Sequence, residues 1–282
     1  MKIPVLIVAT FLALGQSNLK PDPPHKCPDC DDWNKEVPPS RVFGNTYFVG
    51  TDGLSSVLVV SNAGSILLDG GLPQTAPIID ANIRTLGFKT EDIKLILNSH
   101  AHYDHAGGIA ALQRVSGATV AAREPGKRAI ERGEPTLDDP QFAFGRAANA
   151  YPSVPNVRAV ADGETLRLGD VSITAHAVPG HTPGATTWTW KSCEGSRCLE
   201  IVYADSLNAV SADNFRFSGD NTHPSLVPTF RKSIDVVRNL PCDVIISVHP
   251  TRPFIKPDGC RAYADGAETR LDARIAEEQK SR

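Results

Sequence analysis

The chain has 282 residues, of which 41% are hydrophobic and 22% are charged, and its formal net charge is −3. This composition is typical of a globular protein, and the length is sufficient to bury a substantial core. The small net charge gives no indication of binding to nucleic acid or to an anionic membrane surface.

The N-terminus indicates export. It begins with a short positive segment, and residues 4–15 are apolar but too few to span a bilayer. Ala13 and Gly15 supply small residues at the positions that a signal peptidase reads. The alternative is an uncleaved anchor. We expect three parts: a signal peptide over 1–15, an N-terminal arm over 16–40 and one domain over 41–282.

The six cysteines fall into local pairs: Cys27 and Cys30, Cys193 and Cys198, and Cys242 and Cys260. In an exported chain, disulfides are the expected state of such pairs. The first pair could instead be a redox motif or half of a zinc site. No βαβ pattern surrounds it and no second Cys-x-x-Cys exists in the sequence, so we favour a disulfide there too.

The first half of the chain predicts an antiparallel meander followed by alternating helices and strands. Short apolar runs separated by turn residues give four strands, over 42–43, 46–49, 56–60 and 65–69. The next segments are predicted as a helix over 75–86, a strand over 93–97, a helix ending near Gly117, a strand over 118–122 and a short helix over 124–131.

The second half repeats this order after a long segment, 133–156, that shows no clean period. That segment either borders a site or is a plain surface loop. Further strands are predicted over 157–160, 165–168, 171–177, 186–190, 200–204 and 244–248, with helices over 228–240 and 261–277. Two such blocks favour an α/β protein in which two sheets pack together with helices outside.

The most distinctive stretch follows the apolar strand at 93–97. His100, His102, Asp104 and His105 lie within six residues, and two glycines and a helix come next. His100 and His102 alternate along an extended backbone and therefore point the same way, whereas Asp104 and His105 follow after the chain has turned. Imidazole and carboxylate groups are zinc ligands, so this arrangement suits two metal ions close together.

Two more histidines complete the set of candidate ligands. His181 lies on a turn that prolines and glycines make rigid, and His249 ends a predicted strand. We expect His100, His102 and His181 to hold one zinc ion. Asp104, His105 and His249 would hold a second. A water or hydroxide between the two ions would have a lowered pKa and act as nucleophile, and Asp104 would orient it.

Other polar residues near these positions have structural interpretations. Asp69 is expected to support the ligands by hydrogen bonds, because ligating histidines need such partners. His176 is expected to have a structural role, and His25 and His223 are expected on the surface. Asp205 ends a predicted strand, and we favour a structural role over a bridging ligand there.

His-x-His-x-Asp-His, Gly-His-Thr-Pro-Gly at 180–184 and the strand-end His249 resemble the metallo-β-lactamase superfamily. The finer resemblance is to its β-lactamases of subclass B3, since Ser206 stands where other subclasses carry a cysteine ligand. The resemblance implies a four-layer αββα sandwich, two Zn²⁺ ions and a periplasmic enzyme. It further implies hydrolysis of penicillins, cephalosporins and carbapenems, and hence antibiotic resistance. A monomer is the default expectation.

The resemblance also implies three substrate contacts. Ser206 and Asn208 would contact the substrate carboxylate, and Trp33 matches an aromatic residue of the family's N-terminal arm that flanks the pocket. Family members often carry Ser or Thr where Asn208 stands, and no lysine is obviously placed for this contact. The segment 249–260 looks shorter than in typical members. The two later disulfides match bridges of some relatives, whereas the Cys27–Cys30 pair looks additional.

Two other functions remain as alternatives. The first is a lactonase or a thioester hydrolase of the glyoxalase II type, in which Asp205 would bridge the zinc ions. The predicted signal peptide, the disulfides and Ser206 argue against it. The second is a periplasmic zinc-binding protein without turnover, against which the intact Asp104 argues, because a pure binder has no need to orient a hydroxide.

Overall fold

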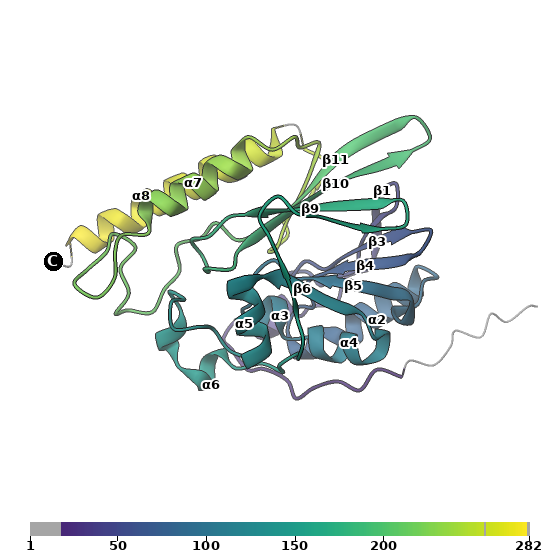
Figure 1. The fold of residues 1–282 in the computed structure, drawn as a ribbon, viewed down its shortest axis with the longest axis horizontal. Coiled ribbons are helices and arrows are strands. Elements are labelled where there is room, and N and C mark those ends of the chain that lie inside the picture. The colour runs from purple at the N-terminus through teal and green to yellow at the C-terminus, as the bar shows by residue number, and fades with distance from the viewer. Residues whose placement is uncertain (1–17, 257, 281–282) are drawn as a thin grey trace, which may run out of the picture.

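The computed structural model describes residues 18–256 and 258–280, so the expected signal peptide over 1–15 lies outside the described residues. Within this range, no helix is long and apolar enough to cross a membrane. The described elements form two sheets with helices on their outer faces, which confirms the αββα sandwich (Figure 1).

The first sheet has seven strands in sequence order. The first four pair antiparallel as the expected meander, and the last four pair parallel. The strands are β1 (Ser40–Phe43), β2 (Thr46–Phe48), β3 (Val57–Ser61), β4 (Gly64–Leu68), β5 (Ile93–Leu97), β6 (Thr119–Arg123) and β7 (Arg158–Val160).

The second sheet has five strands in the order β12-β11-β10-β9-β8. Only the β11–β12 pair is parallel. The strands are β8 (Thr165–Leu168), β9 (Val171–Ala177), β10 (Thr186–Glu194), β11 (Arg197–Ala204) and β12 (Val244–Ser247). The hairpin of β10 and β11 is longer than predicted, so Cys193 and Cys198 face each other within the paired strands.

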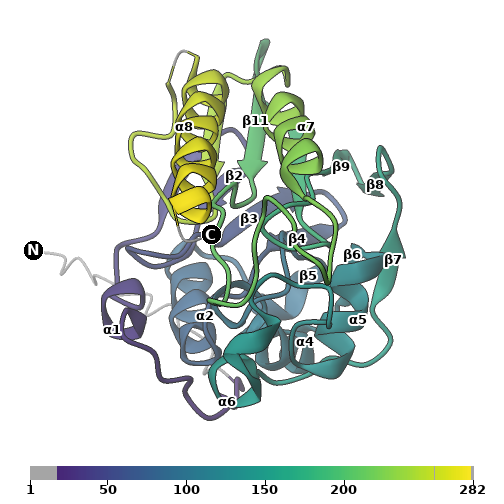
Figure 2. The ribbon, with the colours of Figure 1, turned by 90° about the vertical axis from the view of Figure 1, so that its left-hand side faces the viewer.

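Helices cover both outer faces, as two perpendicular views show (Figures 1 and 2). The longer ones beside the first sheet are α2 (Ala76–Thr85), α4 (Ile109–Ser116) and α5 (Glu124–Arg132), and those beside the second are α7 (Val227–Arg238) and α8 (Gly259–Lys280). Short helices occupy the connections: α1 (Cys30–Trp33), η1 (Pro73–Thr75), η2 (Thr90–Asp92), α3 (Tyr103–Ala106), η3 (Phe142–Phe144) and α6 (Arg146–Asn149).

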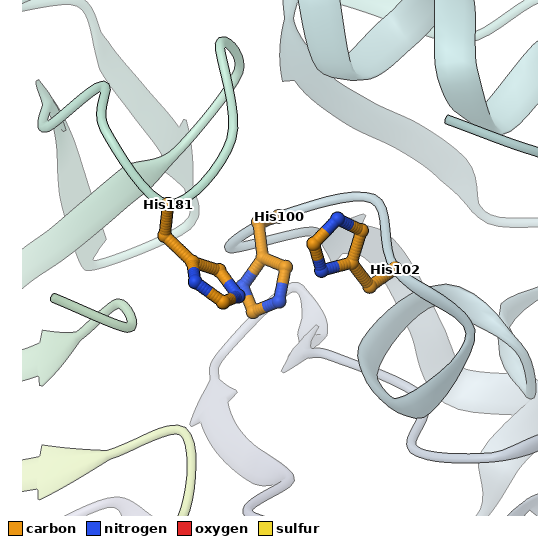
Figure 3. Close-up of side chains that lie close together, drawn as sticks. All are labelled: His100, His102 and His181. Carbon is orange, nitrogen blue, oxygen red and sulfur yellow. The ribbon is translucent and has the colours of Figure 1, made fainter. Parts of the chain in front are cut away.

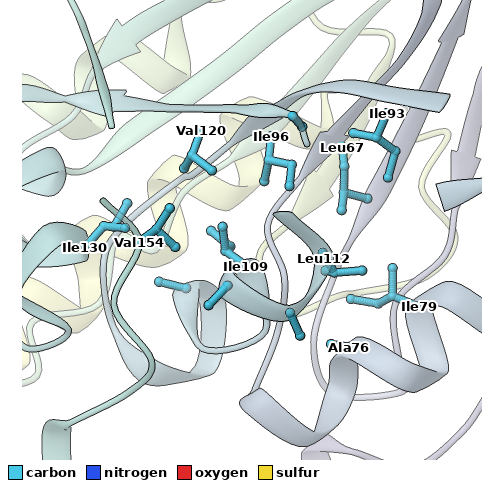
Figure 4. Packing of buried hydrophobic residues seen from close by; sticks show 14 of the residues in the cluster. Leu67, Ala76, Ile79, Ile93, Ile96, Ile109, Leu112, Val120, Ile130 and Val154 are labelled. Carbon is cyan, nitrogen blue, oxygen red and sulfur yellow. The ribbon is translucent and has the colours of Figure 1, made fainter. Parts of the chain in front are cut away.

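Three apolar clusters hold these layers together. One joins α2, α4 and α5 to the first sheet through side chains such as Ile79, Ile96 and Leu112 (Figure 4). The second fills the space between the two sheets and contains Phe48 and Trp188. The third joins α7 and α8 to the second sheet. Because apolar burial is the main stabilising term in folding, the sandwich is a stable frame for loops at its edge.

Helix α8 is longer than predicted and packs more closely. We expected a charged tail helix with little apolar face beyond Leu271 and Ile275, but Ala264 and Ala267 are also fully buried. Small alanines let the helix approach its neighbours, although they give only a weak hydrophobic period.

All six cysteines are joined in the three expected pairs, Cys27–Cys30, Cys193–Cys198 and Cys242–Cys260.

Candidate metal centre

The candidate ligands meet at one edge of the sandwich, where strands end. His100 and His102 lie in the segment after β5, and Asp104 and His105 lie in α3. His181 lies in the turn between β9 and β10, and His249 lies two residues after the end of β12. The carboxyl ends of neighbouring strands share an edge, which explains why residues far apart in sequence converge here.

His100, His102 and His181 form the first group. Their potential ligand atoms lie within 4.8 Å of one another, and all three side chains are buried. Figure 3 shows the three rings close together, His181 approaching from a different segment than the other two. The ring centres are 4.7 Å apart for His100 and His181 and 4.9 Å apart for His100 and His102.

Hydrogen bonds on the outer side of these rings show which nitrogen is free. His100 Nδ1 lies 2.6 Å from Asp205 Oδ1, His102 Nε2 lies 3.1 Å from Asp139 Oδ2, and His181 Nδ1 lies 2.8 Å from the Asn208 carbonyl oxygen. A carbonyl oxygen can only accept a hydrogen bond, so His181 Nδ1 donates one. The nitrogens of His100 and His102 donate in the same way to the carboxylates of Asp205 and Asp139 when these are ionised. The opposite nitrogen of each neutral ring then carries a lone pair directed at the shared centre.

Asp104, His105 and His249 lie beside the first group. Asp104 Oδ2 is 3.1 Å from His105 Nε2 and 3.5 Å from His249 Nε2. His249 Nδ1 donates to the Gly53 carbonyl oxygen over 3.1 Å, which leaves its Nε2 free to face Asp104. The ligand atoms of Asp104 and His105 also lie within 4.8 Å of that of His100, so the two groups adjoin.

Burial and charge set the protonation of these groups. Burial lowers the pKa of His181 to about 3, and burial together with the neighbouring histidines lowers that of His100 well below its usual value. Burial alone would raise the pKa of Asp104, but the charge of His105 outweighs it and the pKa falls well below normal. His100 and His181 are therefore neutral and Asp104 is ionised, which are the forms that bind a metal ion. His105 differs: burial would lower its pKa, but the Asp104 carboxylate outweighs burial and raises the pKa to about 9, so a metal ion that binds there displaces a proton.

A cation fits this arrangement. His105 is fully buried and neither of its ring nitrogens has a hydrogen-bond partner, although Nε2 lies close to Asp104. Buried polar atoms without partners are rare in folded proteins. Once His105 has lost its proton, imidazole nitrogens and a carboxylate that face one another in this way supply the nitrogen and oxygen ligands that zinc takes.

Asp69 supports the centre as expected. Its side chain is fully buried and accepts hydrogen bonds from the Ser99 amide at 2.8 Å, the Ser99 hydroxyl at 2.5 Å and the Tyr203 hydroxyl at 2.9 Å. Asp69 Oδ2 also lies 3.7 Å from His105 Nδ1. The network fixes the start of the ligand-bearing segment relative to both sheets.

Glycines allow two backbones to approach each other beneath the ligands. A Cβ atom at Gly108 would lie 2.2 Å from the Gly70 carbonyl oxygen, and one at Gly70 would lie 2.6 Å from the Ile109 nitrogen. Any larger residue at either position would push the turn after β4 away from α4. This explains the glycine pairs that follow Asp69 and His105 in the sequence.

The expected substrate contacts lie next to the centre. The Trp33 ring is 5.2 Å from the His249 ring. Ser206 and Asn208 line a cavity together with His249. Asp205 is fully buried and its carboxylate bonds His100; it belongs to neither group of candidate ligands among the described residues.

Sequence reasoning missed Asp139, which lies in the segment 133–156 that showed no period. This segment does border the centre, because Asp139 contacts His102 and the Tyr151 hydroxyl donates to the Ala101 carbonyl oxygen over 2.8 Å. No local pattern marks Asp139, since its neighbour along the chain, Asp138, is also acidic but exposed.

Of the remaining histidines, His176 has the expected structural role and bonds Thr189. His25 does not lie free on the surface as expected; it is half-buried, with its ring stacked on Tyr103 at 3.9 Å. The stacking brings the N-terminal arm against α3. His223 is also partly covered, and its ring lies 4.3 Å from that of Phe215.

Comparisons with known proteins agree with this geometry. The family model of the metallo-beta-lactamase superfamily matches residues 49–194. Among solved structures, Rm3 metallo-beta-lactamase is 48% identical with a TM-score of 0.86, over 90% of this chain and 99% of that one. MEM-A1, a subclass B3 metallo-beta-lactamase from a soil metagenome library, is 46% identical with a TM-score of 0.85, over 89% of this chain and 100% of that one.

The chain is also similar to a curated relative with a different enzyme name. The hydroxyacylglutathione hydrolase of Anaeromyxobacter dehalogenans is 28% identical over 223 residues, which are 78% of this chain and 69% of that protein. The family match, the fold and the histidine-rich centre together show that the chain belongs to the metallo-beta-lactamase superfamily. It is a hydrolase whose similar solved structures include subclass B3 enzymes.

Proposed function

We propose that this protein is a zinc-dependent β-lactamase of subclass B3 type that binds two zinc ions per chain. The observation that carries the proposal is the convergence of five histidines and Asp104 with their free ligand atoms facing one another. The similarity to subclass B3 structures over nearly the whole described chain supports the choice of substrate.

His100, His102 and His181 would hold one zinc ion, and Asp104, His105 and His249 the other. Bound zinc supplies a hydroxide at neutral pH and polarises the lactam carbonyl. The reaction adds the elements of water across the lactam C–N bond, leaving a carboxylate and an amine. Asp104 is held ionised between His105 and His249, so it accepts a hydrogen bond from the attacking water and orients it.

Ser206 and Asn208 are proposed to bind the substrate carboxylate, and Trp33 to cover one side of the pocket. The support is their position: the two polar residues line the cavity that includes His249, and the Trp33 ring lies beside the same histidine.

The first test is hydrolysis of a penicillin, a cephalosporin and a carbapenem by the purified mature protein, with and without EDTA. We expect ring opening that EDTA abolishes and added zinc restores; the carbapenem tests carbapenemase activity. Bound zinc without turnover of any of the three would contradict the proposal, and would favour either another hydrolase or a zinc-binding protein.

The second candidate is a thioester hydrolase, which the curated relative favours. It would use Asp205 as a bridging ligand, but the Asp205 carboxylate bonds the Nδ1 of His100 instead. Turnover of a glutathione thioester, measured beside the lactam panel, separates the two functions. We expect hydrolysis of the lactams to exceed that of the thioester by orders of magnitude in kcat/KM.

We further propose that residues 1–15 are a cleaved signal peptide, that the mature chain consists of the arm over 16–40 and one domain over 41–282, and that it works in the periplasm. The three disulfides support an oxidising compartment. Mass spectrometry of the exported protein should place the mature N-terminus near Gln16. An intact N-terminus in the exported protein would contradict cleavage. Sedimentation is expected to show a monomer.

A further inference from the structure

A cavity of about 420 Å³ adjoins the metal centre on the side of α8. His249 and Ser206 line it, so the cavity opens beside the second group of ligands. Its other walls come from the segment after β12 and from the N-terminal half of α8, the long helix at one end of the chain in Figure 2.

One stripe of α8 forms the helical wall. Gly259, Ala262, Tyr263, Gly266 and Arg270 all line the cavity; apart from the adjacent pair Ala262 and Tyr263, they are three or four residues apart and so share one face of the helix. Three of the five are glycine or alanine, which leaves open space. Tyr263 is fixed, because its hydroxyl donates to the Asp205 carbonyl oxygen over 2.8 Å.

The cavity is cationic. Lys256 and Arg270 line it, and no aspartate or glutamate does. In the described part of the chain, no carboxylate forms an ion pair with either of them. Two arginines of the neighbouring helix α7, Arg231 and Arg238, do form ion pairs, both with acidic residues of α8.

The side chain of Arg270 lies over the cavity rather than pointing away from it. Its Nη1 is 3.2 Å from the point where a Cβ atom of Gly266 would lie, so the guanidinium covers the preceding turn of the helix. Long side chains in helices lean toward the N-terminus, which here is the direction of the cavity. Because Gly266 has no side chain, the space above it is free for the Arg270 guanidinium.

We propose that Lys256 and Arg270 form an anion subsite that binds a carboxylate of the substrate, together with Ser206 and Asn208. This inference rests on the proposed β-lactamase function, and it names cations that the sequence did not reveal. Arginine and lysine are the donors that form charge-assisted hydrogen bonds to carboxylates. Because no aspartate or glutamate lines the cavity, no carboxylate of the protein competes with the substrate for these two cations.

The test compares one cephalosporin with its methyl ester, which lacks the carboxylate charge. Wild-type enzyme should have a lower KM for the acid than for the ester. Lys256→Ala and Arg270→Ala should each raise the KM for the acid by about 3- to 10-fold, so that the preference for the acid falls accordingly. Arg261→Ala, which removes an exposed cation of the same helix outside the cavity, is the matched control and should keep the preference.

An unchanged acid-to-ester preference in the Lys256→Ala/Arg270→Ala double variant would overturn the subsite. A second readout needs no turnover: calorimetry with hydrolysed benzylpenicillin, a dicarboxylate, on the zinc-loaded protein. The double variant should bind it about tenfold more weakly than wild type and Arg261→Ala, while equal binding by all three would overturn the inference. Inactivity of wild type toward every lactam would instead count against the proposed function alone.

Discussion

Single hydrogen bonds decide how four of the five histidines of the centre can act. A histidine offers either ring nitrogen, and the sequence does not say which one faces a metal ion. Asp205, Asp139 and the carbonyl oxygens of Asn208 and Gly53 each take one nitrogen, which leaves the other free. Each of these four partners is at least 27 residues away from the histidine that it orients, and Gly53 is 196 residues away from His249.

Asp139 offers the clearest test of whether such hydrogen-bond partners orient the histidines for metal binding. Asp139→Asn removes the charge that faces His102 Nε2 and should weaken zinc binding at the first group by about 10-fold, because outer partners of ligating histidines typically matter by 10- to 100-fold. Competition with a chromogenic chelator measures this directly. Asp138→Asn, an exposed neighbour, should bind zinc as wild type does. Equal zinc affinity in both variants would show that Asp139 does not orient the ligand.

At the level of elements, most helices and strands follow from local pattern. The meander, β5, β9, α2 and α7 lie within a few residues of their predicted bounds, because their apolar residues alternate or recur at helical spacing. The exceptions depend on partners. β10 extends past Trp190 to Glu194 and β11 begins already at Arg197, because each strand supplies the other's hydrogen bonds. α8 packs through alanines whose burial no local period reveals.

The end of α8 is held by one carboxylate. Glu278 is buried and accepts hydrogen bonds from the backbone amides of Phe217 and Ser218 at 2.9 Å each and from Arg274 Nε at 3.0 Å. Burial alone would raise its pKa, but the hydrogen bonds outweigh burial and lower it.

A carboxylate with a lowered folded-state pKa stabilises the protein above its unfolded pKa, about 4.3, and the contribution is lost as the pH falls through the folded pKa. We expect the free energy of unfolding to fall less steeply below pH 5 in Glu278→Gln than in wild type. Urea denaturation between pH 6 and pH 3.5 measures it, with the exposed Glu36→Gln as control. Parallel curves for wild type and Glu278→Gln would refute the prediction.

The disulfides should differ in their contributions. Cys242–Cys260 closes a separation of 18 residues and ties the start of β12 to α8, whereas Cys193–Cys198 closes only 5 within a hairpin. Loop-closure entropy gives about 3 kcal/mol for the first and about 2 kcal/mol for the second. Double Cys→Ser variants of each pair, compared by denaturant midpoint, should therefore show the larger loss for Cys242 and Cys260. The reverse order would mean that strand pairing rather than chain entropy controls the effect.

At the level of the whole molecule, the metal centre joins segments from both halves of the sandwich. His100 and Asp104 follow β5 of the first sheet, whereas His181 and His249 follow β9 and β12 of the second. Any ion bound by these residues links the two halves, and a ligand that binds only the folded state stabilises it.

Removal of zinc should therefore lower the melting temperature of the entire protein in one transition. Free zinc at about a thousand times its Kd contributes roughly 4 kcal/mol, which corresponds to a shift on the order of 10 °C for a domain of this size. Differential scanning calorimetry with and without EDTA measures the shift. A melting temperature that EDTA leaves unchanged would contradict the linkage. The replacement His249→Ala should reduce the shift, whereas His176→Ala should not.

The sequence by itself indicated the two-sheet architecture, four candidate ligands and the cysteine pairs, because each follows from local spacing: apolar periods, one cluster of six residues, and short separations. It indicated His181 and His249 from a rigid turn and a strand end. The tertiary structure alone decided which nitrogen of each histidine is free, that Asp139 reaches His102, and that Lys256 and Arg270 share one cavity. These features join residues far apart in the chain, and their distances are set by how the sheets and helices pack, which no local pattern encodes.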